Sequence, residues 1–307
     1  MSLDTSSSAP PNSQSRSLFQ HESWTTPWSS PDFPPDESLE ARYHRFKQKP
    51  WWGEGNNPPV AHGFLSRRAF SDRSWPWGFV IYRTTYASEE DWAEGIAKLN
   101  RHFDCCLPSP GNEAIRLVRE GLRNVIIDDI STFNGASVET VLKRHQKWVV
   151  EECQIDIDEG EAFGIPRFEF CLMIDEQCLR SILHCGNPVP GGDTDNKVMG
   201  YVNILDMEHN ALAEDYDEGP FHDGCFRLDL DQLWQYPYAS EDRALCDLYK
   251  YRFNSESVLY IDGWGIEYGS KNLVTYTSEM DRGLAIVRTP VEYDGERIAP
   301  DSGEMES

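Results

Sequence analysis

A run of nine residues from Gly78 to Tyr86 constrains the fold more than any other stretch of the chain. It reads Gly-Phe-Val-Ile-Tyr-Arg-Thr-Thr-Tyr, and the predominance of β-branched and aromatic residues predicts a buried strand. Arg83 lies in the middle of this apolar run. Because an unpaired buried charge costs several kcal/mol, we expect its guanidinium to meet a carboxylate, an amide or a substrate.

Changes in composition divide the 307 residues into four regions. Residues 1–38 are rich in Ser, Pro and Asp and predict a disordered tail. Residues 39–75 form a basic and aromatic arm, which Gly55, Pro58 and Pro59 predict to be loop-like and not helical. Residues 76–290 hold the strand and helix patterns of a single domain, and residues 291–307 form an acidic tail.

The pattern within the domain predicts strands and helices in mixed order. Helices are expected from a Ser88 cap to about His102, over Glu113–Leu122, from a Ser137 cap to about Glu152, and from an Asp175 cap to about Leu183. Further strands are expected over Arg167–Ile174, Val198–Asp206 and Cys225–Leu230, with edge strands at Val258–Ile261 and Leu284–Val287. This order predicts an α+β fold with disordered termini, in which helices cover one face of a mixed or antiparallel sheet.

The formal net charge is -24, from 52 acidic and 28 basic residues. This charge disfavours non-specific attraction to DNA or to anionic lipid. The 8 Cys residues show no Cys-x-x-Cys spacing, which is typical of a reduced intracellular chain. The N-terminal residues lack the apolar stretch of a secretory signal, and no apolar run approaches the length of a membrane helix. We therefore expect a cytoplasmic protein.

The arm departs from the overall acidity of the chain. Between Arg42 and Arg73 it carries seven Lys or Arg residues and two acidic residues, interleaved with aromatic residues. Cations that meet phosphates and rings that stack on unpaired bases suit the recognition of RNA ends. The candidate tRNA-binding residues are Arg42, Arg45, Lys47, Lys49, Arg67 and Arg68. Alternatively, the arm wraps the acidic body and neutralises it.

The sequence contains none of the common catalytic signatures, such as a phosphate-binding Gly-Lys loop, a dinucleotide-binding Gly motif or a His-Glu-x-x-His motif. The His residues are scattered singly, so we predict neither a metal site nor a cofactor. Instead, each main strand carries a polar residue within its apolar pattern. These residues are Arg83, Glu169, Asn203 and Arg227.

If Arg83 and Glu169 share a face of the sheet, they could form an ion pair, with Asn203 satisfying a remaining acceptor. In an enzyme, Glu169 would act as general acid or base tuned by Arg83, and Asn203 would orient a substrate carbonyl or amine. Asp175, Tyr201 and Arg227 are the candidate substrate-binding residues. The alternative is a buried network that only fixes the order of the strands.

Several strings together resemble a large group of fungal proteins over residues 76–235. They are Gly78 to Tyr86, the helix start Glu89-Glu90-Asp91-Trp92, Gly135-Ala136-Ser137 before the helix with Trp148, Phe168 to Asp175, and Gly200-Tyr201-Val202-Asn203. The chain also resembles the arginine-containing cyclodipeptide synthases of fungi. That resemblance implies an enzyme of secondary metabolism that joins aminoacyl groups from charged tRNAs, one of them arginyl-tRNA, into a diketopiperazine without ATP.

Two functions are therefore expected as alternatives. The first is a tRNA-dependent cyclodipeptide synthase that uses the polar strand residues as its site. The second is a non-catalytic binding protein, whose acidic body docks a basic partner and whose buried Arg and Glu are structural.

Overall fold

The computed structural model describes the main elements of the expected domain. The described residues are 34, 36–50, 52, 77–106, 113–157, 165–188, 198–207, 224–230 and 233, and the backbone of 258–259, 274–275, 286–287 and 289–290. Most of the predicted N-terminal tail, the arm from residue 53 to 76 and the predicted C-terminal tail lie outside the described residues.

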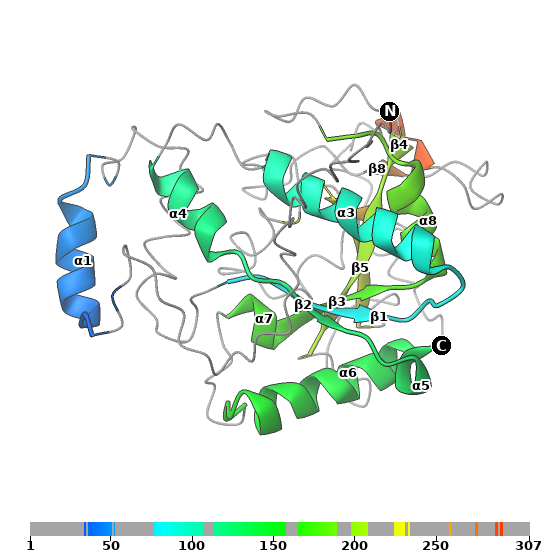
Figure 1. The fold of residues 1–307 in the computed structure, drawn as a ribbon, viewed down its shortest axis with the longest axis horizontal. Coiled ribbons are helices and arrows are strands. Elements are labelled where there is room, and N and C mark those ends of the chain that lie inside the picture. Colours follow the sequence, from blue (N-terminus) through cyan, green and yellow to red (C-terminus); the bar gives the residue numbers. More distant parts are fainter. Residues whose placement is uncertain are drawn as a thin grey trace, which may run out of the picture.

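The fold is organised around a mixed sheet of eight strands (Figure 1). Along the sheet the strands follow the order β10-β8-β7-β6-β5-β3-β1-β2. Five neighbouring strands are β2 (Val125–Ile127), β1 (Val80–Arg83), β3 (Phe170–Ile174), β5 (Tyr201–Asp206) and β6 (Cys225–Asp229). The sheet continues through β7 (Val258–Leu259), β8 (Val274–Thr275) and β10 (Thr289–Pro290), while β4 (Val198–Met199) pairs separately with β9 (Ile286–Val287). The predicted α+β fold with a mixed sheet is confirmed.

The directions of the strands bring several strand ends to one edge of the sheet. Strand β1 lies between β2 and β3 and is parallel to both. Strand β5 is antiparallel to β3 and to β6. Consequently β1, β2, β3 and β6 end, and β5 begins, at the same edge. We call this the carboxyl edge.

Helices cover both faces of the sheet (Figure 1). On one face, Ile81 and Leu172 pack in a core cluster with residues of α3 (Glu89–Cys106) and α8 (Glu176–His184). On the other face, Tyr82 and Cys171 pack with residues of α6 (Val138–Lys147) and of the π-helix η1 (Trp148–Glu152) that continues it. The expectation that helices cover one face only is therefore wrong.

The reason is strand β2, which the sequence pattern did not reveal. The chain leaves β1 through α3 and α4 (Glu113–Gly121), enters β2, and then crosses to the opposite face through α5 (Ile130–Phe133) and α6. As a result all four residues of β1 are buried. A continuous apolar run, as in Val80–Tyr82, is typical of a strand covered on both faces.

The predicted helix starts are confirmed by their capping hydrogen bonds. Ser88 Oγ accepts from the Asp91 backbone N–H at 3.1 Å, and Ser137 Oγ accepts from Thr140 at 3.3 Å. The Asp175 carboxylate accepts from the Cys178 N–H at 2.8 Å. Each cap satisfies a backbone donor that has no partner within its own helix.

Other segments also differ from the predicted secondary structure. Residues Pro166–Glu169 form the short helix α7, so β3 begins at Phe170 and not at Arg167. A proline at the first position of a helix fixes a helical φ, which explains the turn. In the arm, Leu39–Lys47 form helix α1, which starts from a Ser38 cap. The glycine and prolines that suggested a loop lie beyond this helix.

We predict that Gly78→Ala destabilises the domain by about 2 kcal/mol or more. Gly78 has a φ of +144°, and an added Cβ would collide with the Arg123 carbonyl. Gly135→Ala is the matched control, because Gly135 has a φ of +69° but nothing within 4 Å of an added Cβ. Urea unfolding should show a larger loss for Gly78→Ala. Equal losses would mean that the contact with Arg123 contributes nothing beyond backbone strain.

Candidate functional site

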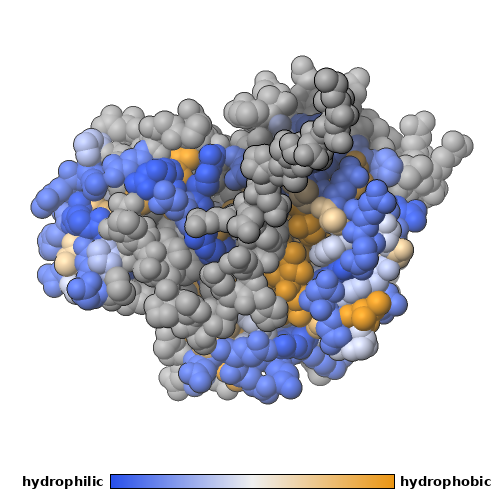
Figure 2. All heavy atoms as spheres, in the orientation of Figure 1, coloured by the Kyte–Doolittle hydropathy of each residue, from blue (hydrophilic) through white to orange (hydrophobic). Residues whose placement is uncertain are grey.

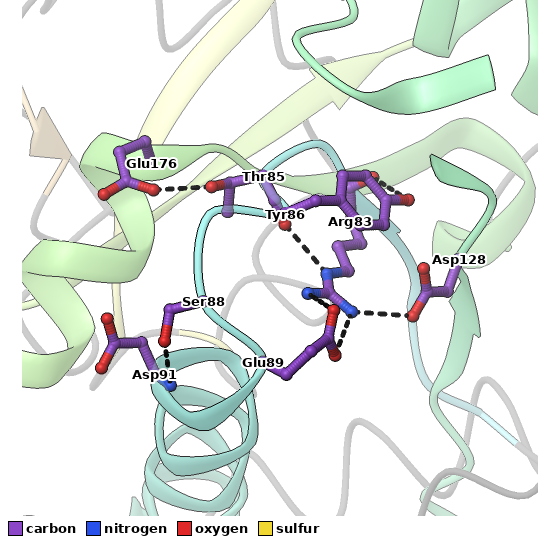
Figure 3. A network of polar contacts seen from close by, with 8 residues as sticks. All are labelled: Arg83, Thr85, Tyr86, Ser88, Glu89, Asp91, Asp128 and Glu176. Atoms are coloured by element: carbon purple, nitrogen blue, oxygen red, sulfur yellow. Dashed lines mark hydrogen bonds and ion pairs between the residues drawn. The ribbon is translucent and has the colours of Figure 1, made fainter. Parts of the chain in front are cut away.

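Arg83 is buried at the carboxyl edge, and all three nitrogens of its guanidinium donate hydrogen bonds (Figure 3). Its side chain is 3% exposed. Two guanidinium nitrogens donate to the Glu89 carboxylate at 2.7 and 2.9 Å, and one of them also donates to Asp128 at 3.1 Å. The third guanidinium nitrogen, Nε, donates to the Thr85 carbonyl at 2.9 Å. The bidentate contact with Glu89 is the strongest geometry that a guanidinium and a carboxylate can adopt.

Two aromatic rings complete the surroundings of the guanidinium. Its carbon atom lies 4.4 Å from the centre of the Tyr86 ring and 4.7 Å from that of Trp92. Cation–π contacts of this kind stabilise a cation that has lost its water. The Tyr86 hydroxyl in turn donates to the Arg83 carbonyl at 3.1 Å. The expectation that the Arg83 charge is compensated is confirmed, and the compensating carboxylates are Glu89 at the start of α3 and Asp128 after β2.

The parallel strands explain how these residues come together. Arg83 is the last residue of β1, Asp128 follows the last residue of β2, and Glu89 is the first residue of α3. Since β1 and β2 are adjacent and parallel, their carboxyl ends place Arg83 and Asp128 side by side. The short connection from β1 to α3 brings Glu89 back over the same strand end.

A second set of contacts extends the network to α8 (Figure 3). The Thr85 hydroxyl donates to the Glu176 carboxylate at 2.6 Å. The Thr84 N–H donates to the Ile174 carbonyl at 3.0 Å, and the Thr84 hydroxyl bonds the same carbonyl at 3.2 Å. Direct hydrogen bonds therefore connect the loops that follow β2, β1 and β3.

The charges of this network depend on one another. Burial by itself lowers the pKa of Arg83, but the hydrogen bonds that Arg83 donates to Glu89 and Asp128, together with the charges of these carboxylates, outweigh burial and raise that pKa. The hydrogen bond from Arg83 holds the pKa of Glu89 below its usual range. A carboxyl group with a lowered folded-state pKa stabilises the fold above its unfolded pKa. That contribution is lost as the pH falls through the folded-state pKa.

A separate polar cluster lies at the same edge, on the other side of β3. Asn203 Nδ2 donates to Asp175 at 2.9 Å. The Arg227 guanidinium donates to Gln177 at 2.8 Å and lies 4.7 Å from the centre of the Tyr201 ring. Five of the six residues expected in the site, Arg83, Asp175, Tyr201, Asn203 and Arg227, are therefore at the carboxyl edge.

Glu169, the expected general base, is at the opposite end of the sheet. In the β1–β3 pair, Arg83 is opposite Ile174, five residues along the chain from Glu169. At about 3.3 Å per residue, the two positions are separated by about 16 Å along the strand direction. The expected ion pair between Arg83 and Glu169 is therefore wrong. The alternation of side chains indicates which face of the sheet a residue lies on, but not its position along the strand direction.

Several cations of the arm form contacts with other residues of the protein. Glu37 forms ion pairs with both Arg42, at 3.6 Å, and Arg45, at 2.7 Å. Lys49 pairs with Glu113 of α4 at 2.9 Å, and Lys47 lies over the Tyr43 ring. Arg67 and Arg68 lie outside the described residues. Arg42 and Arg45 of α1 therefore pair with the neighbouring Glu37, and Lys49, just after α1, neutralises an acidic group of the body.

Sequence reasoning missed Glu89, Asp128, Thr85 and Glu176 as partners in the network. Each lies one to six residues beyond the end of a strand at the carboxyl edge. Their position in the sequence could have identified them, because polar residues that directly follow adjacent parallel strands converge at one edge. That signal becomes readable only once β2 is known to be a strand.

Among the described residues, no three His, Cys, Asp or Glu side chains are grouped so that they could hold a metal ion. None of the helices in the described ranges has the length and apolar character needed to span a membrane. Comparisons with family models, curated proteins and solved structures find no match to this chain.

We predict that Arg83→Lys lowers the free energy of unfolding by about 2 kcal/mol. A lysine ammonium lacks the planar geometry that reaches Glu89, Asp128 and the Thr85 carbonyl at once. Arg180→Lys is the matched control, because Arg180 makes an exposed ion pair with Glu176 at 2.8 Å. It should change stability by less than about 0.5 kcal/mol. Similar losses in the two variants, measured by denaturant unfolding, would contradict a special role for Arg83.

Proposed function

We propose that the carboxyl edge binds a basic protein partner. The observation that carries this proposal is that carboxylates outnumber cations at this edge among the described residues. The described cations there already form ion pairs within the protein. We call these carboxylates the acidic rim. The acidic rim consists of Glu89, Glu90, Asp91, Asp128, Asp129 and Glu176.

The acidic rim keeps a surplus of negative charge. Among the described residues, the cations that form ion pairs with the rim are Arg83, with Glu89 and Asp128, and Arg180, with Glu176. The side chains of Glu89 and Asp128 are nevertheless 76% and 42% exposed. Hydrogen bonds from Ser131 and Thr132 hold the pKa of Asp129 low, so this group stays ionised. The rim therefore presents exposed negative charge that a positively charged partner can neutralise.

The same carboxylates disfavour a phosphate ligand. Open sheets with parallel strands commonly bind ligands at their carboxyl edge, and helix N-termini there attract anions. In this chain, however, α3 begins with Glu89, Glu90 and Asp91. Negative side chains in the first turn satisfy the helix dipole and repel an incoming phosphate. A partner rich in Lys and Arg matches both the rim and the net charge of -24.

The experiment is titration of the full chain with a fluorescent oligo-arginine peptide at low salt. We predict that Glu90→Gln/Asp91→Asn weakens binding about fivefold, because two exposed rim charges are lost. The control variant, Asp104→Asn/Glu120→Gln, removes the same net charge from exposed sites at the far end of α3 and on α4. It should leave the affinity nearly unchanged.

Two results would contradict the proposal. Equal weakening by both variants would show that the peptide senses net charge and not the rim. Absence of binding to the folded protein at low salt would reject the rim as a docking surface. Rising salt should weaken a genuine rim complex, because exposed charges are screened.

A second candidate function is the aminoacyl-tRNA-dependent cyclodipeptide synthase, with arginyl-tRNA as one substrate. It is supported by the gathering of Asp175, Asn203, Tyr201 and Arg227 at the carboxyl edge, where acidic groups could hold an arginyl side chain. Glu169 cannot act there as the base, so another carboxylate would have to take the amine proton. Expression in a heterologous host should then yield a product with the mass of cyclo(Arg-Xaa). Soluble, folded protein without such a product would reject this function.

A further inference from the structure

His145 of α6 is a titratable residue that is enclosed in the apolar core between α6 and the sheet. It is 0% exposed. Its ring stacks on the Trp148 ring at 5.7 Å and meets the Tyr82 ring edge to face at 5.8 Å. Nδ1 lies 3.3 Å from the Tyr82 hydroxyl, and the Arg167 backbone is close to the ring. Nε2 is sealed from solvent and forms no hydrogen bond of good geometry with the described residues. The site therefore suits a neutral imidazole.

A proton on His145 would find no carboxylate to balance its charge. The titratable groups packed around Tyr82 and His145 are Arg144, Glu152, Cys153, Arg167 and Cys171. The only carboxylate in this set, Glu152, already accepts from Arg144 at 2.6 Å. Burial raises the pKa of the Cys153 thiol to about 12 and that of Cys171 well above its usual range, so both thiols are neutral. A buried charge without a counter-charge costs several kcal/mol.

The pKa of His145 changes when α6 leaves the sheet. Burial lowers this pKa to about 3; the Arg167 backbone opposes the shift, and the charge of Arg144 adds to it. An imidazole in water has a pKa of about 6.5. Below that pH the opened segment binds a proton that the closed segment excludes. Opening therefore becomes more favourable as the pH falls from about 6.5 to about 3, and the closed form regains its full stability above about 6.5.

The segment that carries His145 forms an outer layer of the fold. Helix α6 and the π-helix η1 lie on the side of the sheet away from α3 (Figure 1). Gln154, just after η1, has a φ of +55° and is the one non-glycine residue with a positive φ in the described part of the chain. A side chain in this left-handed conformation adds strain. The two helices can therefore separate from the sheet without unfolding α3.

We propose that protonation of His145 releases α6 and η1 from the sheet, so that this face of the fold opens more readily in mildly acidic solution. Release uncovers the apolar side chains that now pack together in this layer, among them Tyr82, Val149 and Phe168. The opening uses none of the acidic-rim residues, so this proposal and the basic-partner proposal can fail independently.

The test is amide hydrogen exchange of the full chain at about pH 7 and about pH 5, with rates corrected for the intrinsic effect of pH. The opening constant of residues 138–152 should rise about 25-fold, which is the value for one imidazole of pKa about 6.5 that is protonated only in the open form. These residues should also exchange faster than β1 at both pH values. A rise of less than about threefold would overturn the proposal. Exchange at the rate of β1 would also overturn it, because the face would then open only by global unfolding.

Variants assign the pH dependence to one residue. His145→Gln keeps a polar side chain that does not titrate, so the rise between the two pH values should shrink to less than about threefold. His184→Gln is the matched control, because His184 is an exposed helical histidine, and it should keep the full rise. A full rise in His145→Gln would contradict the proposal. If His145→Gln does not fold, the exchange of the unmodified chain decides alone.

Discussion

The structure depends on a positive charge that is enclosed at the end of its most buried strand. Arg83 lies at the carboxyl end of β1, where both faces of the sheet are covered and its side chain is 3% exposed. A cation in that place costs several kcal/mol unless carboxylates compensate it. Glu89 and Asp128 supply the compensation. The pairing therefore also joins the start of α3 to the residue that follows β2.

The candidate sites follow from the same arrangement. Parallel pairing of β1 with β2 and β3 brings three loops to the carboxyl edge, and the antiparallel β5 and β6 add Asn203 and Arg227. On one side of the edge, carboxylates outnumber the cations that neutralise them. On the other side, a capping carboxylate holds a buried amide next to a guanidinium. A basic partner is the ligand that we propose for the first of these two arrangements.

Local features of this fold could be predicted from sequence because their causes are local. Ser88, Ser137 and Asp175 begin helices as expected, since capping depends on a residue and its next three neighbours. Strand β2 was missed because Val125–Ile127 is too short to show a period. The partner of Arg83 was assigned wrongly to Glu169, because alternation does not specify strand direction or register. The direction and register of β3 depend on how the chain crosses from β2 through α6. That path is set by the whole chain and cannot be read from one strand.

Amide hydrogen exchange of the Arg83→Lys variant tests the central claim most directly. If Arg83 joins the loops of the carboxyl edge, exchange should accelerate both over residues 84–92 and over residues 128–133, while β5 and β6 remain protected. Acceleration in only one of these segments, or none in a folded variant, would contradict the account. In that case the position of the two loops would depend on packing of the helices and not on the buried guanidinium.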